Sequence, residues 1–205
     1  MKICLNQIAK RYQQNWIFKD LSLDIPSGTS LAILGNNGSG KSSLLRIIAA
    51  MQTATKGSIT YTHNQQNIDS NSLYKQLSYA AVGMQLIEEF TLSELLSFHF
   101  SFKKSIHQLT VAEIISILDM KNVQSKLVGD FSSGMKQRIK LAQAIFSDVP
   151  VLFLDEPCTN LDETGYALYQ SLIQDYASHK LIIVSSNDKA EYHFCEEVID
   201  IKNYK

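Results

Sequence analysis

The stretch Gly35-Asn36-Asn37-Gly38-Ser39-Gly40-Lys41-Ser42 decides the fold of this chain. It matches the pattern G-x-x-x-x-G-K-[ST], in which glycines let the backbone curl so that successive N–H groups point at a phosphate group. The preceding residues, 30–34, are apolar and uncharged and predict a buried strand. Apolar side chains then recur at helical spacing, at Leu44, Leu45, Ile47, Ile48 and Met51. This context predicts a phosphate-binding loop that runs into the N-terminus of a helix, where free N–H groups favour an anion.

Each polar group of this loop has an expected task. Lys41 would reach the β- and γ-phosphates of a nucleoside triphosphate, and the hydroxyl of Ser42 would hold Mg²⁺. The candidate nucleotide-binding residues are Gly35, Asn36, Asn37, Gly38, Ser39, Gly40, Lys41, Ser42 and the adjacent Ser43. The alternative is an ordinary glycine-rich turn, which the flanking strand and helix disfavour.

The composition is that of an ordinary globular chain. Its 205 residues, 45% hydrophobic and 19% charged, suffice for one domain with a sizeable core. The formal net charge of −1 gives no indication of nucleic-acid binding. Cys4, Cys158 and Cys195 are far apart and lack metal-ligand spacing, which is typical of reduced thiols in a cytosolic protein. We expect no signal peptide and no membrane-spanning segment, so any membrane role must come through a partner.

Strand and helix patterns alternate along the chain. Strands are expected at about 3–8, 18–25, 56–62, 151–155, 181–184 and 198–201. Helical spacing runs from Leu92 to about Asn122 and again over 164–177, whereas 63–72 is polar and typical of a loop. We therefore expect one α/β domain over 1–205, with a core at about 1–90 and 148–205 and a helical insertion at about 91–147.

A pair of acids follows the second apolar strand of the core. Asp155 and Glu156 come at the end of the run Val151-Leu152-Phe153-Leu154. Ligands of parallel α/β sheets sit at the carboxyl ends of the strands. Asp155 would hold Mg²⁺, and Glu156 would act as general base on the attacking water. The alternative is that the acids only mark the point where the strand leaves the core.

The segment between these two motifs carries a resemblance to a known family. Phe131-Ser132-Ser133-Gly134-Met135-Lys136-Gln137-Arg138 resembles the L-S-G-G-Q signature of ATP-binding-cassette (ABC) ATPases, in the form F-S-x-G-M. The run from Glu156 to Asp162 is similar to the family's E-P-T-x-x-L-D, which extends from the catalytic glutamate through the D-loop. Tyr12 resembles the aromatic residue that stacks on adenine, with Trp16 as a substitute. The alternative for Tyr12 is a half-buried tyrosine of an edge strand.

The resemblance covers essentially the whole chain and implies a fold and an assembly. The fold is a phosphate-loop NTPase core, a mixed sheet with flanking helices, joined to an N-terminal antiparallel β subdomain and an inserted helical subdomain. Two cassettes would sandwich two ATP molecules, as a homodimer or a heterodimer. The signature residues acting on the other copy's site would be Ser132, Ser133, Gly134 and Met135. Of these, the Ser132 hydroxyl and the Gly134 N–H would face the γ-phosphate held by Lys41 of the other copy. The Ser-Ser-Gly turn opens an expected helix over 135–146, and its alternative role is a plain helix cap.

Two positions depart from the family's pattern. Val82 occupies the position of the Q-loop glutamine, and Gln85 follows three residues later as an uncertain Mg²⁺ ligand. Asn187 occupies the position of the switch histidine after the strand at 181–184; it can donate a hydrogen bond but cannot become a charged donor. The alternative for Asn187 is a cap of the helix over 189–194. We expect ATP binding to be kept and hydrolysis to be slow.

The resemblance implies the ATP-hydrolysing subunit of a membrane transporter. Its transmembrane subunits would be separate chains that dock against the helical insertion and the loop at 79–91, on the cytoplasmic face of the membrane. The short chain and the G-M form of the signature are similar to exporter groups, including the small haem-exporter ATPase of cytochrome c maturation, and favour export over import. One alternative is a nucleotide-dependent binding module outside transport. The other is a weakened ATPase that pairs with an intact cassette. No nucleic-acid partner is expected.

Overall fold

Two β-sheets and a helical block make up the computed structural model, which describes residues 1–205. The first sheet is antiparallel, with strand order β2-β1-β4-β5. Its strands are β1 (Lys2–Tyr12), β2 (Asn15–Ile25), β4 (Lys56–His63) and β5 (Gln66–Ile68). The core sheet has the order β6-β7-β8-β3-β9. Its strands are β3 (Ser30–Leu34), β6 (Leu77–Ala81), β7 (Val151–Asp155), β8 (Leu181–Ser185) and β9 (Glu197–Asp200).

The expected α/β class with an antiparallel N-terminal sheet is confirmed, but the core sheet is not mixed. Every pairing within it is parallel. Parallel neighbours need long crossover connections, and the helices of this chain supply them. The antiparallel pairs are confined to the first sheet, where short turns join β1 to β2 and β4 to β5, and β1 also pairs with β4 from farther along the chain.

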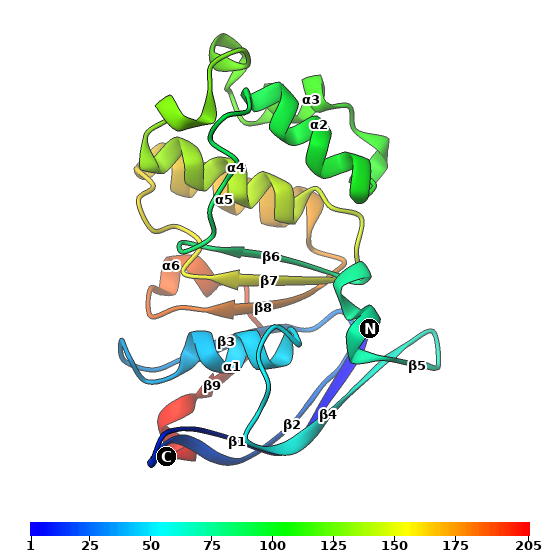
Figure 1. Cartoon of the computed structure of the whole chain (residues 1–205), viewed down its shortest axis with the longest axis vertical. Helices are drawn as coiled ribbons and strands as arrows, with labels where there is room; N and C mark the ends of the chain where they lie inside the picture. The colour runs from blue at the N-terminus through cyan, green and yellow to red at the C-terminus, as the bar shows by residue number, and fades with distance from the viewer.

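Helices cover both faces of the core sheet. The longer ones are α1 (Lys41–Ile48), α2 (Leu92–Phe102), α3 (Val111–Ile117), α4 (Ser133–Ile145) and α5 (Glu163–Tyr176). In Figure 1, α1 lies between the core sheet and the antiparallel sheet, whereas α4 and α5 lie on the other side of the core sheet with α2 and α3 beyond them. Of the segment expected as a helical insertion at about 91–147, α2 and α3 form the outer layer, whereas α4 packs on the core sheet beside α5.

Two apolar cores lie on the two faces of the core sheet. Phe153 of β7 and Ile183 of β8 belong to the core shared with α1 and the antiparallel sheet. Their neighbours Leu152 and Val184 belong to the core shared with α4, α5 and the helical insertion. Successive side chains of a strand point to opposite faces, so a strand covered on both faces is apolar throughout. This explains why these strands appear in the sequence as continuous apolar runs.

The helical insertion is stabilised at the starts of its helices. Thr91 begins α2 and Thr110 begins α3, each with a capping box that includes Glu94 or Glu113. A cap of this kind contributes about 1 kcal/mol. The shorter helices are η1 (Ser70–Lys75), η2 (Ile106–Gln108), η3 (Lys121–Val123), η4 (Val128–Asp130), α6 (Lys189–Tyr192) and η5 (Ile201–Tyr204). None of the helices combines the length and the apolar character that crossing a bilayer requires.

The segment expected to be a loop at 63–72 contains regular structure. The strand β5 pairs with β4 through a two-residue turn formed by Asn64 and Gln65, both in the left-handed region with φ of 49° and 63°. Such turns match the twist of a hairpin but are usually marked by Asn-Gly or Asp-Gly. Because the glycine is absent here, the polar composition indicated a loop, and that expectation was wrong.

Candidate nucleotide-binding site

The backbone of the phosphate-binding loop takes a conformation that glycine permits. Gly40 immediately precedes α1 and has a φ of 105°. A Cβ atom at this position would lie 2.3 Å from Cγ2 of Ile17 on β2. Position 40 therefore needs glycine both for its dihedral angle and for the close approach of the antiparallel sheet. The first turn of α1 contains no acidic residue, so its N-terminus keeps its attraction for an anion.

Two polar side chains of the loop, those of Ser39 and Lys41, are buried. Lys41 is only 4% exposed, and its Nζ donates hydrogen bonds to the carbonyl oxygens of Gly35 at 2.7 Å and Asn36 at 3.4 Å. The hydroxyl of Ser39 is buried without a hydrogen-bond partner. Buried polar groups in folded proteins are almost always paired. The unpaired hydroxyl beside a buried lysine indicates that a polar ligand completes this loop, which an ordinary glycine-rich turn would not require.

The two oxygen groups expected to hold a metal ion meet in the structure. The hydroxyl of Ser42, in the first turn of α1, donates a hydrogen bond of 2.9 Å to Oδ1 of Asp155 at the carboxyl end of β7. Mg²⁺ binds oxygen atoms and usually takes only one or two protein ligands, together with phosphate oxygens and waters. A hydroxyl and a carboxylate at this separation, beside the phosphate-binding loop, fit that ion.

Glu156 follows Asp155 in a strained conformation. Its φ is 48°, in the left-handed region that residues with side chains rarely adopt. Its N–H donates to the carbonyl oxygen of Ser185 at the end of β8. Strain of this kind persists where the surroundings enforce it, and it gathers at functional sites. Here it directs the glutamate into the same cavity as Lys41.

A single cavity of about 360 Å³ contains most of the nucleotide-binding candidates. It is lined by Tyr12, Ile17, Asn37, Gly38, Gly40, Lys41, Ser42, Ser43 and Glu156. Ile17, on β2 beside the buried Phe18, was not among the sequence candidates.

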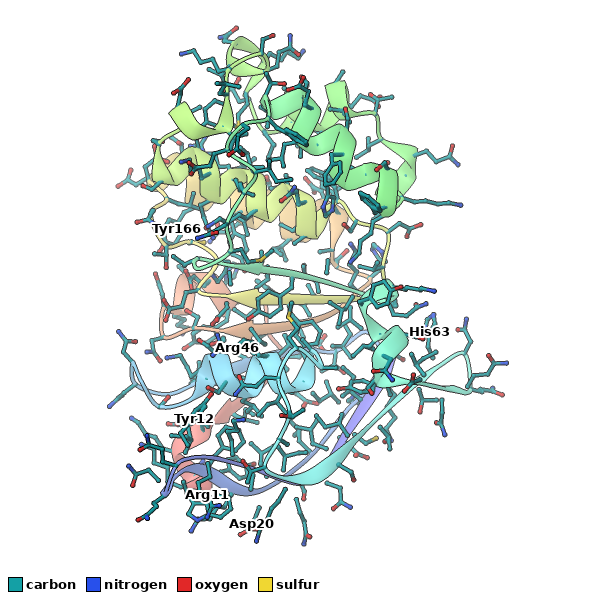
Figure 2. The ribbon with its side chains drawn as sticks, in the orientation of Figure 1. Arg11, Tyr12, Asp20, Arg46, His63 and Tyr166 are labelled. Atoms are coloured by element: carbon teal, nitrogen blue, oxygen red, sulfur yellow. The ribbon has the colours of Figure 1, made fainter.

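Tyr12 ends β1 at the mouth of this cavity, where it is 46% exposed. Its hydroxyl lies 3.3 Å from Oγ of Ser43 and accepts a hydrogen bond of 2.6 Å from Nε2 of Gln52. In Figure 2, Tyr12 lies between the antiparallel sheet and α1. Trp16 is not part of the cavity lining; it lies against the side chains of Arg11 and Lys56, with their cationic atoms 5.3 and 5.5 Å from its ring. Of the two aromatic candidates, only Tyr12 lines the cavity that contains Lys41.

The signature segment forms a second cavity, of about 340 Å³, with the D-loop. Ser132 caps α4 by accepting a hydrogen bond from the N–H of Met135 at 3.3 Å. A Cβ atom at Gly134 would lie 2.9 Å from the carbonyl oxygen of Asn160, so glycine allows the two loops to touch. Lys41 lines the first cavity and not the second. Within one chain, the signature segment and the phosphate-binding loop therefore line two separate cavities.

Asp162 connects the D-loop to the signature helix. Its carboxylate accepts the N–H of Gly165 at 2.8 Å, which caps α5, and pairs with Arg138 of α4 at 3.1 Å. The N–H of Gly165, the hydroxyl of Thr164 and the charge of Arg138 hold the pKa of Asp162 below its usual value. The D-loop candidate therefore fixes the relative positions of α4 and α5.

Asn187 contacts the phosphate-binding loop directly. Its Oδ1 accepts the N–H of Gly35 at 3.3 Å, and its Nδ2 donates to Oδ1 of Asn37 at 3.3 Å. The alternative role of Asn187 as a helix cap is wrong, because α6 is capped by the next residue, Asp188, which accepts the N–H of Ala190 at 2.9 Å.

Gln85 is not brought to the proposed metal ligands. The strand β6 ends at Ala81, paired with Asp155, and the carbonyl of the next residue, Val82, accepts a hydrogen bond of 2.6 Å from Lys140 of α4. The chain then continues toward α2, and Gln85 lines two other cavities together with residues of the helical insertion. Gln85 does not line the cavity that contains Lys41 and Ser42.

Comparison with known proteins agrees with this arrangement. A protein-family model described as ABC transporter matches residues 18–159. An ABC transporter ATP-binding protein of Bacillus subtilis (strain 168) is 32% identical over 185 residues, which cover 90% of this chain and 84% of the relative. The Nod factor export ATP-binding protein I of Rhizobium johnstonii is 32% identical over 90% of this chain and 61% of its own length. The sulfate/thiosulfate import ATP-binding protein of Synechocystis is 30% identical over 100% of this chain and 59% of its own length.

Solved structures share the fold. A putative ABC transporter ATP-binding protein from Pyrococcus furiosus has a TM-score of 0.82 at 21% identity, with 100% of both chains covered. An ATP-binding cassette solved as a dimer in a post-hydrolysis state with ADP and phosphate has a TM-score of 0.80 at 20% identity, covering 97% of this chain and 93% of its own. The architecture of two sheets with a helical layer is therefore that of a known class of nucleotide-binding proteins.

Proposed function

Because the chain belongs to the ABC transporter family, with the site of an ATP-binding cassette ATPase, we propose that it is the subunit that powers a membrane transporter whose membrane-spanning subunits are separate chains. The observation that carries this proposal is the assembly of Lys41, Ser42 and Glu156 in one cavity, with Asp155 bonded to Ser42. These are the groups that phosphoryl transfer to water requires.

Each residue of the cavity has a role in the proposed reaction. Tyr12 stacks on the base, and the N–H groups at the start of α1 bind the phosphates. Lys41 exchanges its carbonyl partners for oxygen atoms of the β- and γ-phosphates. Ser42 and Asp155 would hold Mg²⁺, which when bound would offset the phosphate charge. The carboxylate of Glu156 accepts a proton from the attacking water, which then bonds to the γ-phosphorus as ADP leaves.

Asn187 supports this reaction as a neutral group. Its amide already spans the N–H of Gly35 and the side chain of Asn37, beside the phosphate-binding loop. It can offer a hydrogen bond to the γ-phosphate or the attacking water but no positive charge. Together with the distant Gln85, this leaves fewer charge-stabilising groups in the site, so we expect slow hydrolysis.

The separation of the signature cavity from the cavity of the phosphate-binding loop supports a dimer as the active form. In one chain the signature cavity contains Ser132 and Gly134 but not Lys41. A second cassette placed head to tail would bring its signature helix, whose first turn has no acidic residue, to the ATP held by the first. We propose a homodimer as the simplest such assembly, since one chain contains both halves.

An apolar groove on the helical insertion supports docking of a membrane subunit. The groove holds about 250 Å³ and is lined by Gln85, Leu86, Ile87, Leu95, Phe98, His99, Phe102, Lys103 and Gln143. Phe98 is 45% exposed and Phe102 is 76% exposed, and their rings meet edge to face with centroids 5.1 Å apart. Exposed apolar groups gathered in one place indicate an interaction surface. In the proposed assembly, the chain would lie at the cytoplasmic face of the membrane with this groove against the membrane subunit.

The direction of transport is a finer proposal. The relatives of this chain include ATP-binding proteins named for export and for import. We propose export on the basis of the G-M form of the signature at Gly134 and Met135, which resembles that of exporter groups. Co-purification of an export-type or import-type membrane subunit tests this choice.

A second candidate function follows from the placement of Gln85 and Asn187. A cassette that lacks two polar groups at its catalytic site would suit a heterodimer in which an intact partner cassette hydrolyses ATP. The purified chain distinguishes the two candidates, because only the first predicts phosphate release from ATP by this chain alone, abolished by Lys41→Ala.

Mixing two inactive variants tests the proposed dimer. Lys41→Ala leaves the signature intact, whereas Ser132→Arg leaves the phosphate-binding loop intact. If each ATP is held by the loop of one copy and the signature of the other, a mixed dimer contains one complete site and regains activity. No recovery on mixing, with ATP binding by Ser132→Arg preserved, would contradict the head-to-tail arrangement.

A further inference from the structure

Tyr166 joins the D-loop helix to the loop that carries Asn187. Its hydroxyl donates a hydrogen bond of 2.9 Å to Oδ2 of Asp188. Tyr166 lies one turn into α5, where its N–H bonds to the carbonyl of Asp162 at 2.9 Å. In Figure 2 it is labelled on the side of the molecule where α6 lies. None of the motifs in the sequence pointed to this residue.

The contacts on the α5 side lead to the signature helix. Asp162 caps α5 and pairs with Arg138 of α4 at 3.1 Å. Arg138 also donates to the hydroxyl of Thr164 at 2.8 Å. The start of α5 is thus fixed to the face that, in the proposed dimer, meets the ATP of the partner.

The contacts on the other side lead to the phosphate-binding loop. Both the backbone and the side chain of Asp188 make hydrogen bonds. Its N–H donates to Oγ of Ser186 at 2.9 Å, and its Oδ1 caps α6 by accepting the N–H of Ala190. The residue before it, Asn187, binds the N–H of Gly35 and the side chain of Asn37. A continuous series of contacts therefore runs from Arg138 through Tyr166 to the loop that holds ATP.

We propose that Tyr166 is a positioning residue for ATP hydrolysis, which fixes the loop of Asp188 so that Asn187 is held against the phosphate-binding loop. This inference rests on the proposed function.

The hydroxyl of Tyr166 is suited to a permanent contact. Burial and the carboxylate of Asp188 raise the pKa of Tyr166 well above its usual value. The hydroxyl therefore remains a hydrogen-bond donor throughout the pH range in which the protein works. The second carboxylate oxygen of Asp188 is engaged by Ala190, so Tyr166 is the contact that links this cap to another helix.

Tyr166→Phe tests the inference, because it removes the hydroxyl and keeps the ring. The matched control is Tyr176→Phe on the same helix, whose ring packs against Phe146 with centroids 4.8 Å apart and whose hydroxyl makes no hydrogen bond. In the full-length chain, hydrogen exchange read by mass spectrometry should become faster in peptides that cover 35–37 and 186–188 for Tyr166→Phe only. The kcat for ATP should fall about tenfold while KM stays within about twofold.

A double mutant separates positioning from a general structural role. If Tyr166 acts through Asn187, the loss caused by Tyr166→Phe should largely disappear in the Asn187→Ala background. Exchange and kcat equal to those of Tyr176→Phe, or the same fold loss with and without Asn187, would overturn the inference. If the parent chain releases no phosphate at all, the proposed hydrolysis fails, and the exchange measurement alone decides whether Tyr166 holds this loop.

Discussion

The Ser42 hydroxyl donates a hydrogen bond of 2.9 Å to Oδ1 of Asp155, which joins the first turn of α1 to the carboxyl end of β7. These residues are far apart in the sequence. Asp155 is the last residue of a core-sheet strand, and Ser42 lies in the first turn of the helix that packs on that sheet. The contact brings a hydroxyl and a buried carboxylate together beside the phosphate-binding loop. It is the place where a metal ion bound to the phosphates would meet the protein.

Asp155→Asn should weaken the use of Mg²⁺ without disturbing the fold. The amide oxygen can still accept the hydrogen bond from Ser42, but the negative charge that attracts the ion is gone. We expect the Mg²⁺ concentration for half-maximal ATP hydrolysis to rise by at least about tenfold. Asp175→Asn, at an exposed position on α5, is the control. A Mg²⁺ dependence that matches the parent's would show that Asp155 does not hold the ion.

Glu156→Gln should bind ATP but hydrolyse it at least about 100-fold more slowly, because the amide cannot accept the proton of the attacking water. The trapped ATP should favour the dimer, which light scattering after size exclusion measures in the presence of ATP. Turnover at the parent rate would mean that another group serves as the base.

Asn187→His should introduce a pH dependence that the parent lacks at this position. An amide does not titrate, whereas a histidine changes charge near pH 6.5. We expect kcat of the variant to change between pH 6 and pH 8 with an apparent pKa of about 6.5, relative to the parent measured in parallel. Identical pH profiles for the two proteins would indicate that position 187 does not contact the reacting phosphate.

His99 should make the folded state less stable at acidic pH. Burial lowers its pKa from 6.5 to about 4, and its Nε2 lies 3.1 Å from Oγ of Ser147. The unfolded chain therefore binds a proton at pH 5 that the folded chain does not, so stability is complete above pH 6.5 and declines as the pH falls toward 4. We expect about 1–2 kcal/mol to be lost between pH 7.5 and pH 5 through this residue.

Urea unfolding of the parent and of His99→Gln at the two pH values measures this loss. Glutamine can keep a hydrogen bond to Ser147 but does not titrate, so the variant should lose less stability on acidification. An equal loss in both proteins would assign the acid sensitivity to other groups.

Phe102→Glu should separate ATP hydrolysis from membrane association. Phe102 is 76% exposed in the apolar groove at the end of α2 and does not line the cavity that contains Lys41, so the isolated variant should keep the parent's ATPase rate. A charge in the groove should abolish recovery of a membrane subunit in pull-downs. The control is Tyr74→Glu, because Tyr74 is also an exposed aromatic residue, at 62%, but lies outside the groove. This variant should still recover the membrane subunit. Loss with both variants, or with neither, would contradict the assignment of the groove.

Four of the five strands of the core sheet could be predicted from the sequence because their environment leaves a simple pattern, whereas β6 was not among the expected strands. β3 and β7 have the bounds that their apolar runs indicated, since strands covered on both faces have no polar interruption. The helices α4 and α5 begin and end within about two residues of their expected limits, as frayed ends allow. The phosphate-binding loop is similarly local, because its glycines and its helix lie in one stretch.

The remaining features depend on contacts between distant residues. The path of the chain after β6 is set by the bond from Lys140 to the carbonyl of Val82 and by the bond from the N–H of Gly129 to Glu88, and these direct Gln85 away from the metal ligands. No local pattern near Gln85 reveals either bond. The sequence also did not show whether Asn187 or Asp188 caps α6, because both residue types favour caps. The fold decides, since the side chain of Asn187 is bonded to the phosphate-binding loop.

The measurement that tests the central claim most directly is co-purification from membranes. The chain, tagged and expressed at its native level, would be extracted with a mild detergent and isolated, and the proteins that accompany it identified. The account predicts a polytopic membrane protein in near-equal amount, lost with Phe102→Glu. Recovery of the chain without any membrane protein, or only with ribosomes, would contradict the claim that it powers a transporter.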